Sequence, residues 1–429
     1  MICSNIAIDN GHLTFAGRDT VELAGKYGTP LYLMDEQRIR HNCQVYKESM
    51  DRYFARALPL YASKALSCKR LYEIVSEEGM GTDVVSPGEL YLARSAGFPM
   101  ERVFFHGNAK TDADIQFAMD CEVGYFVVDN PDELAAVNRF AGARGLTQKV
   151  LLRVTPGIDP HTFEAVSTGK VDSKFGIPIE TGQALDFVAS ALGMEHVQVM
   201  GLHAHVGSQV FASTVFYDTA DIMLQFLAQI QEKLGYTCEM LNLGGGYGVR
   251  YTEQDPTVDI GYELSTVARH IQEGSRRLGI REPMVLMEPG RSIVADAGMT
   301  LYTVQSTKRI PGYRNYVAID GGMTDNPRYA LYRSAYTVYL ANKMDQAKDF
   351  PCTVGGRCCE SGDMIQENVA LPVPERGDIL AVCTTGAYNY AMASNYNSIP
   401  RPPIVMVDGE KDYVAVRRET FQDLAAREV

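Results

Sequence analysis

The chain has 429 residues, of which 46% are hydrophobic and 22% charged; this allows two domains with a sizeable core and excludes a disordered protein. The formal net charge of −13 argues against nucleic acid or an anionic membrane as a partner, yet it allows a local positive pocket for a small anionic substrate. Residues 1–11 lack the features of a secretory signal, and no apolar run approaches the roughly 18 residues that span a bilayer. The nine cysteines show neither a CxxC pair nor metal-ligand spacing. They predict reduced thiols, no metal site and a cytoplasmic location.

Short apolar runs occupy residues 1–34 and are interrupted by Gly11 and the turn at 28–30. They predict strands around one small helix rather than the start of a β/α repeat. Because they cannot belong to such a repeat, we expect them to join a separate β domain.

Strands and helices alternate from residue 35 onward. A long helix is predicted up to Ala57, and strands are predicted at 58–62, 81–85, 102–106, 125–129, 149–154, 197–205, 238–243 and 284–288. Helices are predicted at 66–78, 86–96, 111–119, 130–143, 181–192, 213–234 and 260–277, with N-caps at Ser86, Thr111, Asn130, Thr181 and Ser213. This count and size are typical of a (β/α)8 barrel of the TIM type, with a doubly wound sheet as the alternative. The connection at 155–179 is long, which suggests a functional loop.

The helical period is lost beyond Arg291. Strands are predicted at 293–297, 299–310, 316–319, 336–341, 349–354, 379–382, 403–408 and 411–416, separated by Gly and Pro turns. The predicted fold is therefore α/β: a barrel over 35–292 and a C-terminal all-β, Greek-key barrel-like domain over 293–429, which residues 1–34 join.

Polar residues gather where the predicted barrel strands end, which is where barrels carry their functional groups. The residues at these ends are Lys64, Asp83, His106, Asn108, Arg153, His203, His205, Ser208, Gly244, Gly245, Gly246, Glu288 and Arg291. A desolvated lysine at such a place can attack a carbonyl carbon, although a solvated lysine at a helix start is the commoner explanation for one such residue alone.

The other groups suggest partners for a flat, phosphorylated cofactor. Glycines 244–246 can bring backbone N–H groups close to a phosphate, although a tight turn explains such a run equally well. Glu288 can pair with a protonated ring nitrogen, or it forms an ion pair with Arg291. For His203-Ala-His205, we expect only one imidazole to face the site, where it can stack on a ring. Zinc lacks a convincing third ligand. An amine, a phosphate cradle and a carboxylate together point to pyridoxal 5'-phosphate.

A series of motifs now makes the chain resemble the fold-type III pyridoxal-phosphate decarboxylases, and among them the branch that acts on diaminopimelate. The similarity runs nearly end to end. The motifs lie at 61–65, 83–90, 105–110, 173–176, 203–209, 244–246, 288–291, 320–323, 359–363 and 386–388.

The resemblance implies roles for named residues. It implies that Lys64 holds the cofactor, that His205 stacks on its ring, and that Glu288 pairs with the ring nitrogen. It places these further residues around the cofactor: Asp83, Ser208, Gly244, Gly245, Gly246, Gly290, Arg291 and Tyr388. It assigns the substrate's distal carboxylate to Arg291, Arg328 and Tyr332, with Tyr388 nearby, the distal ammonium to Glu360, and proton donation to Cys359. Cys359 and Glu360 are implied to come from a partner subunit, so the active form is expected to be a homodimer with shared sites.

Several positions depart from the family pattern. Ser63 stands where valine is common, Leu66 where asparagine is common, and Asn389 where glycine is common, while Tyr329 replaces a proline after Arg328. Leu66 is expected to weaken a hydrogen bond at a helix start. No departure removes a catalytic group.

The expected reaction is decarboxylation of the small-molecule substrate meso-2,6-diaminopimelate to L-lysine and CO2, the last step of lysine biosynthesis. The alternatives are a decarboxylase of carboxynorspermidine, arginine or ornithine, a non-catalytic binding protein, and a racemase. Arg328 and Tyr332 argue against ornithine, whose far end lacks a carboxylate, and Glu288 argues against a racemase.

Overall fold

The computed structural model describes residues 1–158 and 172–429. The chain divides into two compact units: the β unit, of residues 1–41, 249–257 and 291–429, and the barrel unit, of residues 42–248 and 258–290. The connection predicted to be functional at 155–179 falls largely on residues 159–171, which lie outside the described residues.

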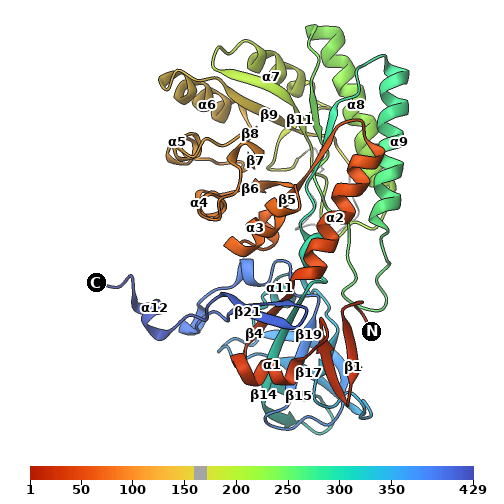
Figure 1. Cartoon of the computed structure of the whole chain (residues 1–429), viewed down its shortest axis with the longest axis vertical. Coiled ribbons are helices and arrows are strands. Elements are labelled where there is room, and N and C mark those ends of the chain that lie inside the picture. The colour runs from red at the N-terminus through yellow and green to blue at the C-terminus, as the bar shows by residue number, and fades with distance from the viewer. Residues whose placement is uncertain (159–171) are drawn as a thin grey trace. The chain divides into compact units, whose positions relative to one another are not determined.

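Parallel strands close the barrel unit into a ring (Figure 1). The order is β5-β6-β7-β8-β9-β11-β12-β13, and β13 pairs with β5 in parallel, so the predicted TIM-type barrel is confirmed. The strands are β5 (Ala57–Ala62), β6 (Gly81–Val84), β7 (Val103–Phe105), β8 (Tyr125–Val128), β9 (Gln148–Thr155), β11 (Val197–His203), β12 (Met240–Asn242) and β13 (Met284–Met287). A two-residue strand, β10 (Ile177–Pro178), also pairs with β9.

Helices alternate with these strands as predicted. They are α2 (Glu36–Tyr53), α3 (Lys69–Glu77), α4 (Pro87–Ser95), α5 (Asp112–Asp120), α6 (Pro131–Ala143), α7 (Gln183–Leu192), α8 (Thr214–Leu234) and α9 (Ile260–Leu278). Inside the ring, the strands contribute one apolar cluster of Leu60, Phe104, Val127, Leu151, Met200, Met240 and Leu286. The barrel is thus filled by side chains and is not a pore.

Local capping chemistry sets several helix starts. Ser86, Thr111 and Asn130 cap α4, α5 and α6 through their side chains, as predicted. The prediction at Thr181 is wrong, whereas Ser213 is the N-cap residue of α8 as predicted but makes no side-chain cap. α7 begins after Gly182 without a side-chain cap, and the Ser213 hydroxyl instead donates to Glu263 at 2.7 Å.

Two sheets and short helices form the β unit. The small sheet joins β1 (Ile6–Asp9), β2 (His12–Phe15) and β3 (Arg18–Asp19). The large sheet has the order β18-β17-β15-β14-β4-β20-β21, with β19 and β16 branching from β14. Its strands are β4 (Leu31–Asp35), β14 (Gly298–Arg309), β15 (Asn315–Ile319), β16 (Val338–Leu340), β17 (Phe350–Gly355), β18 (Met364–Leu371), β19 (Ile379–Cys383), β20 (Ile404–Asp408) and β21 (Lys411–Val416). Strand β4 pairs with both β14 and β20, so the two ends of the chain share one sheet.

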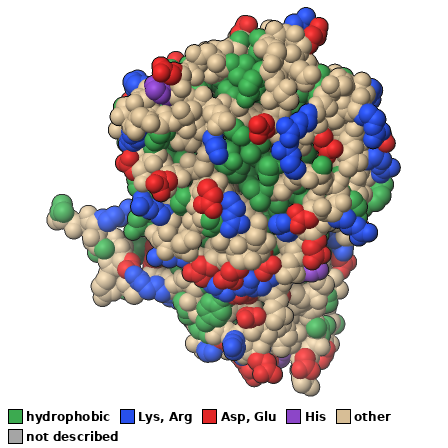
Figure 2. Space-filling model, turned by 45° about the horizontal axis from the view of Figure 1, so that its top comes forward, with side chains coloured by type: hydrophobic (Ala, Val, Ile, Leu, Met, Phe, Trp, Pro, Cys, Tyr) green, Lys and Arg blue, Asp and Glu red, His purple; other side chains and the backbone are tan. Residues whose placement is uncertain are grey.

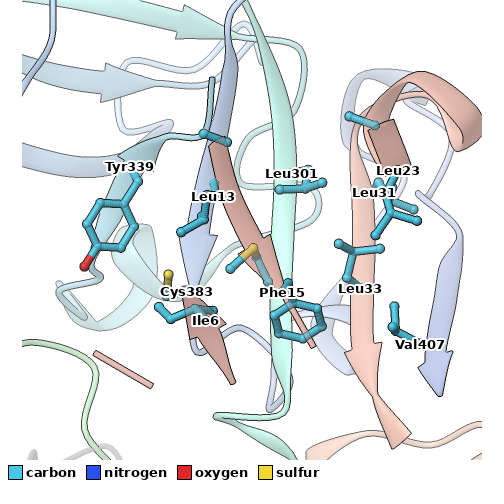
Figure 3. Close-up of a cluster of buried hydrophobic side chains, with 14 of the residues drawn as sticks. Ile6, Leu13, Phe15, Leu23, Leu31, Leu33, Leu301, Tyr339, Cys383 and Val407 are labelled. Atoms are coloured by element: carbon cyan, nitrogen blue, oxygen red, sulfur yellow. The ribbon is translucent and has the colours of Figure 1, made fainter. Parts of the chain in front are cut away.

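One apolar cluster ties these strands together (Figure 3). Leu13 and Phe15 from β2 pack with Leu31 from β4, Leu301 from β14 and Val407 from β20, and all are buried. Residues that are more than 250 positions apart along the chain therefore share one hydrophobic core.

Some elements of the β unit differ from the prediction. Residues 293–297 were expected to form a strand, but Arg291–Val294 form the single-turn helix α10. The short apolar run there is buried in either conformation, so periodicity cannot distinguish the two. Strand β18 was not predicted because its pattern is polar, and the helices α11 (Arg328–Tyr332) and α12 (Phe421–Ala425) are too short to show a period. Helix α1 (Thr20–Tyr27) is the small N-terminal helix that was predicted.

Within the described residues, no helix combines the length and the apolar character that crossing a bilayer requires. On the face drawn in Figure 2, acidic and basic side chains are interspersed rather than separated into areas of one sign.

Replacing Gly201 of β11 by alanine tests the close packing of the barrel wall. A Cβ there would lie 1.8 Å from the carbonyl oxygen of Met240 on β12, so the neighbouring backbone would have to move. We expect the free energy of unfolding to fall by about 3 kcal/mol. The control is Gly193→Ala, where the nearest atom would lie at 3.5 Å. Urea denaturation that gives equal stabilities for the two variants would contradict this account.

Candidate functional site

Lys64 lies in the one-turn 3-10 helix η1 (Ser63–Ala65), directly after β5. The sequence analysis considered a lysine desolvated by burial, but the Lys64 side chain is exposed. Its amine is therefore accessible to a bound molecule. Its charge acts on Asp83, Glu89 and His205, which are therefore its electrostatic neighbours.

The departure at Ser63 has a structural explanation. The buried Ser63 hydroxyl donates to Glu89 at 2.9 Å, and Glu89 also accepts from the backbone N–H of Val85 at 2.7 Å. The start of η1 is thus fixed to the segment after β6. Leu66 follows η1 and precedes α3, so the expected effect on a helix-start hydrogen bond does not arise there.

The buried Glu288 carboxylate follows β13 and is surrounded by donors from three other strands. His106 Nε2 approaches Glu288 Oε1 at 2.8 Å, and His203 Nε2 lies 3.2 Å from Oε2. The Asn242 amide donates to Oε1 at 2.7 Å. Side chains that are at least 46 positions from Glu288 in the chain therefore meet on one charge.

Burial and charge act in opposite directions on this cluster. Burial alone would raise the pKa of Glu288, but the neighbouring His106 and His203 hold it well below its usual range. Burial lowers the pKa of His203 to about 4 and also lowers the pKa of His106. These shifts favour an ionised carboxylate between two neutral imidazoles, of which His203 hydrogen-bonds to Glu288 while His106 Nε2 lies close to it without a hydrogen bond within the described residues.

Asp83, at the end of β6, is buried beside the same cluster. Burial, followed by the charge of Glu288, raises the pKa of Asp83 well above its usual range, while Lys64 opposes the shift. One of its carboxyl oxygens, Oδ1, is buried and makes no hydrogen bond within the described residues. Such an oxygen is suited to a polar group of a bound molecule.

His205 lies beside the glycine segment. Its Nδ1 accepts from the Gly245 N–H at 3.3 Å, and burial, followed by the charges of Lys64 and Arg153, lowers its pKa well below the usual range. Glu288 and His203 also act on it. The prediction that only one of the two imidazoles faces the site is therefore wrong. Side chains two residues apart along a strand point to the same face, so alternation by itself favours a shared side for the two imidazoles; β11 itself ends at His203.

The glycine segment 244–246 requires glycine because of close backbone contacts. A Cβ on Gly245 would lie 2.0 Å from the Glu288 carbonyl oxygen, and one on Gly246 would lie 2.1 Å from that of Gly207. Gly290 is similar, since its Cβ would lie 2.8 Å from that of Ala62 at the end of β5. Ser208 is half-buried after β11. The segment thus brings backbone within reach of a phosphate.

In the β unit, tyrosine rings surround two buried arginines. Arg291 donates to the Tyr251 hydroxyl at 2.6 Å, and its guanidinium carbon lies 4.7 Å from the Tyr388 ring centroid. The guanidinium of Arg328 lies 5.5 Å from the Tyr332 ring and 5.7 Å from the Tyr388 ring. Arg328 is 8% exposed, and its Nε makes no hydrogen bond within the described residues.

The backbone is strained at Tyr388, whose ring lies beside Arg291 and Arg328. Tyr388 adopts a φ of 62°, which costs about 1–2 kcal/mol for a non-glycine residue. Such strain clusters at binding sites. The next residue, Asn389, which departs from the family pattern, is fully buried and accepts a hydrogen bond from Tyr336 at 3.3 Å.

Cys359 and Glu360 lie in a loop of the β unit before β18, and both are exposed. The Cys359 N–H donates to the Asn397 side chain at 2.8 Å, and the Gly362 N–H donates to Glu360 at 3.3 Å. Their neighbour Cys358 is buried, which raises the pKa of its thiol to about 11. None of the nine cysteines forms a disulfide.

The structure therefore gathers Lys64, Asp83, His205, glycines 244–246 and Glu288 in the barrel unit, and Arg291, Arg328, Tyr332 and Tyr388 in the β unit. The sequence analysis missed Asn242, Tyr251 and Tyr336. A signal existed for Asn242, because it is polar at the end of an otherwise apolar strand. Tyr251 and Tyr336 gave none, because their partners are distant in the chain.

Comparison with known proteins gives consistent matches. The family described as "Pyridoxal-dependent decarboxylase, pyridoxal binding domain" matches residues 36–295. The chain is 43% identical to the diaminopimelate decarboxylase of Bacillus subtilis (strain 168), over 97% of this chain and 94% of that protein. It is 40% identical to that of Staphylococcus aureus (strain COL), over 97% of both.

Solved structures agree with these matches. The diaminopimelate decarboxylase of M. jannaschii in complex with L-lysine has a TM-score of 0.91 and 33% identity, over 100% of this chain and 98% of that one. The Helicobacter pylori enzyme with L-lysine has a TM-score of 0.86 and 30% identity, over 95% and 98%.

The buried His203 should make stability depend on pH. The unfolded chain binds a proton at this imidazole near pH 6.5, whereas the folded chain does so only near pH 4, so unfolding is favoured as the pH falls between these values. We expect wild type to lose about 3 kcal/mol more than His203→Gln over this range. Urea denaturation at several pH values measures the difference.

The groups whose charges act on His203 are Glu288, His106 and Arg153, and all are present in both proteins. Their own titration therefore largely cancels in the comparison. Parallel stability curves for wild type and variant would show that the imidazole is not kept neutral.

Proposed function

The chain belongs to the pyridoxal-dependent decarboxylases, and we propose that it converts meso-2,6-diaminopimelate into L-lysine and CO2 with pyridoxal 5'-phosphate as its cofactor. The observation that carries the choice of substrate is Arg328. This buried guanidinium forms no ion pair with a carboxylate within the described residues, and its Nε makes no hydrogen bond there. A carboxylate on the substrate is its best partner, because it can bind a guanidinium through two parallel hydrogen bonds.

Diaminopimelate has such a carboxylate at its far end, whereas ornithine does not. L-lysine, which retains one carboxylate, is the ligand in the M. jannaschii and Helicobacter pylori relatives. Arg291, with its Tyr251 contact, and Tyr332 complete the carboxylate site in this proposal, and Tyr388 lies beside both arginines.

The residues of the barrel unit fit pyridoxal phosphate. Glycines 244–246, whose Cβ positions are blocked by backbone, suit a phosphate, together with Ser208 and Gly290. When bound, the cofactor supplies an aldehyde for an amine and a ring that takes up the electron pair left by departing CO2. Lys64 provides the amine, His205 lies against the ring, and Asp83 provides a polar contact. Glu288, held ionised, keeps a proton on the ring nitrogen.

The proposed active form is a homodimer. Cys359 and Glu360 are exposed in the β unit, as is expected if they serve the site of a partner subunit. Cys359 then returns a proton to the reacting carbon, and Glu360 binds the distal ammonium. We also propose a cytoplasmic location, which the absence of disulfides among the nine cysteines supports.

Arg328→Ala tests the choice of substrate. Loss of a buried charge-assisted hydrogen bond should lower kcat/KM for diaminopimelate by about 100-fold. The control is Arg333→Ala, an exposed arginine at the end of the same helix, α11, which should retain wild-type activity. Release of CO2 is measured with diaminopimelate, carboxynorspermidine, arginine and ornithine. A wild type that prefers ornithine, or an Arg328→Ala variant with unchanged kcat/KM, would refute the proposal.

Mixing two inactive variants tests the shared site. Lys64→Ala and Cys359→Ala alone should show little activity, but their mixed dimer contains one intact site. After subunit exchange, about one quarter of wild-type activity should return. A mixture that stays inactive although exchange is shown by mass would mean that Cys359 serves its own subunit.

A further inference from the structure

The carboxylate of Glu288 has a donor on each side and a third that links it to the glycine segment. His106 and Asn242 approach Oε1, and His203 approaches Oε2. Asn242 is fixed in one orientation, because its amide donates to Glu288 while its Oδ1 accepts from the Gly244 N–H at 2.9 Å. These donors stand at the ends of β7, β11 and β12, so three strands determine where the carboxylate lies.

A carboxylate only accepts hydrogen bonds, so each imidazole must carry its proton on Nε2. The two rings are 4.8 Å apart in an edge-to-face arrangement, and both are buried. Two imidazolium charges at this distance, with Arg153 acting on both, would repel strongly. The neutral form with Nε2–H suits both contacts, because it avoids placing a nitrogen lone pair against the carboxylate. His203 makes the hydrogen bond, whereas His106 Nε2 lies 2.8 Å from Oε1 but is not aligned for one, and the Nδ1 atom of His203 has no hydrogen-bond partner within the described residues.

We propose that His106 and His203 are positioning residues that, as neutral Nε2–H donors, aim the Glu288 carboxylate and leave its negative charge available for the cofactor's ring nitrogen. This inference rests on the proposed function. A charged imidazolium would cancel the carboxylate and compete with a protonated ring, whereas a neutral donor orients the carboxylate without cancelling it.

Matched variants test the proposal. Glutamine places an amide N–H near the position of Nε2, whereas leucine fills the volume without a donor. We expect His203→Leu and His106→Leu to weaken pyridoxal-phosphate binding by the protein by about tenfold or more, and the glutamine variants to restore most of it. The dissociation constant is measured by absorbance titration of cofactor-free protein.

The pH at which the absorbance of the bound cofactor changes is a second readout, and it should shift in the leucine variants only. The control is His270→Leu, because His270 lies on α9 and contacts Asp221 and Tyr217. Equal binding and equal pH response in all variants would overturn the proposal. So would leucine and glutamine variants that are impaired alike, because the proton donor would then not matter.

A measurement on wild type remains decisive if a variant fails to fold. Long-range 1H–15N spectra of 15N-histidine-labelled holoenzyme should show two neutral imidazoles protonated at Nε2. The signals of His106 and His203 are identified by their loss in whichever glutamine variants fold. Two imidazolium or Nδ1–H signals would overturn the proposal, as would one metal ion per purified chain that is lost in His203→Gln, since these side chains are also close enough together to bind a metal.

The proposed function can fail separately. Wild type that binds pyridoxal phosphate in a histidine-dependent way but releases no CO2 from diaminopimelate would refute the substrate and keep the positioning role. An active wild type whose leucine variants bind the cofactor normally would keep the proposed substrate and refute the positioning role.

Discussion

The barrel unit depends on one buried charge, the carboxylate of Glu288. Burying a carboxylate is costly unless donors replace the water that it loses. His203 and Asn242 supply hydrogen bonds from two strand ends, and His106 Nε2 at a third lies 2.8 Å from the carboxylate. The arrangement exists only when the ring of strands is closed through the β13–β5 pairing, so the electrostatics of the site and the closure of the fold cannot be separated.

The glycine segment 244–246 is held directly against Glu288 by backbone contacts. The Glu288 N–H donates to the Gly244 carbonyl at 2.7 Å, and the Gly245 backbone passes so close to Glu288 that a side chain would not fit. Asn242 bridges the carboxylate and the start of the glycine segment. The strands therefore fix the separation of the two groups that we propose bind the phosphate and the ring nitrogen of the cofactor.

In the β unit the constraint is different, because the charges are positive and the partners are aromatic. Tyrosine rings surround Arg291 and Arg328 and shield them from water, which strengthens their attraction for an anion. The segment 249–257, which supplies Tyr251, interrupts the barrel unit in the chain to join this cluster. The proposed preference for a substrate with a distal carboxylate rests on Arg328 together with this aromatic environment.

The sequence by itself determined the alternation of strands and helices, the caps at Ser86, Thr111 and Asn130, and the place of Lys64 after a strand. These features depend on hydrogen bonds and periodicity within a few residues, which the local sequence contains. Only the tertiary structure decided that β11 stops at His203, that Asn242 and Tyr251 take part, and that residues 291–294 are helical. Each of these depends on partners dozens of positions away, brought together when the barrel closes and the sheet of the β unit assembles, and no local pattern records such contacts.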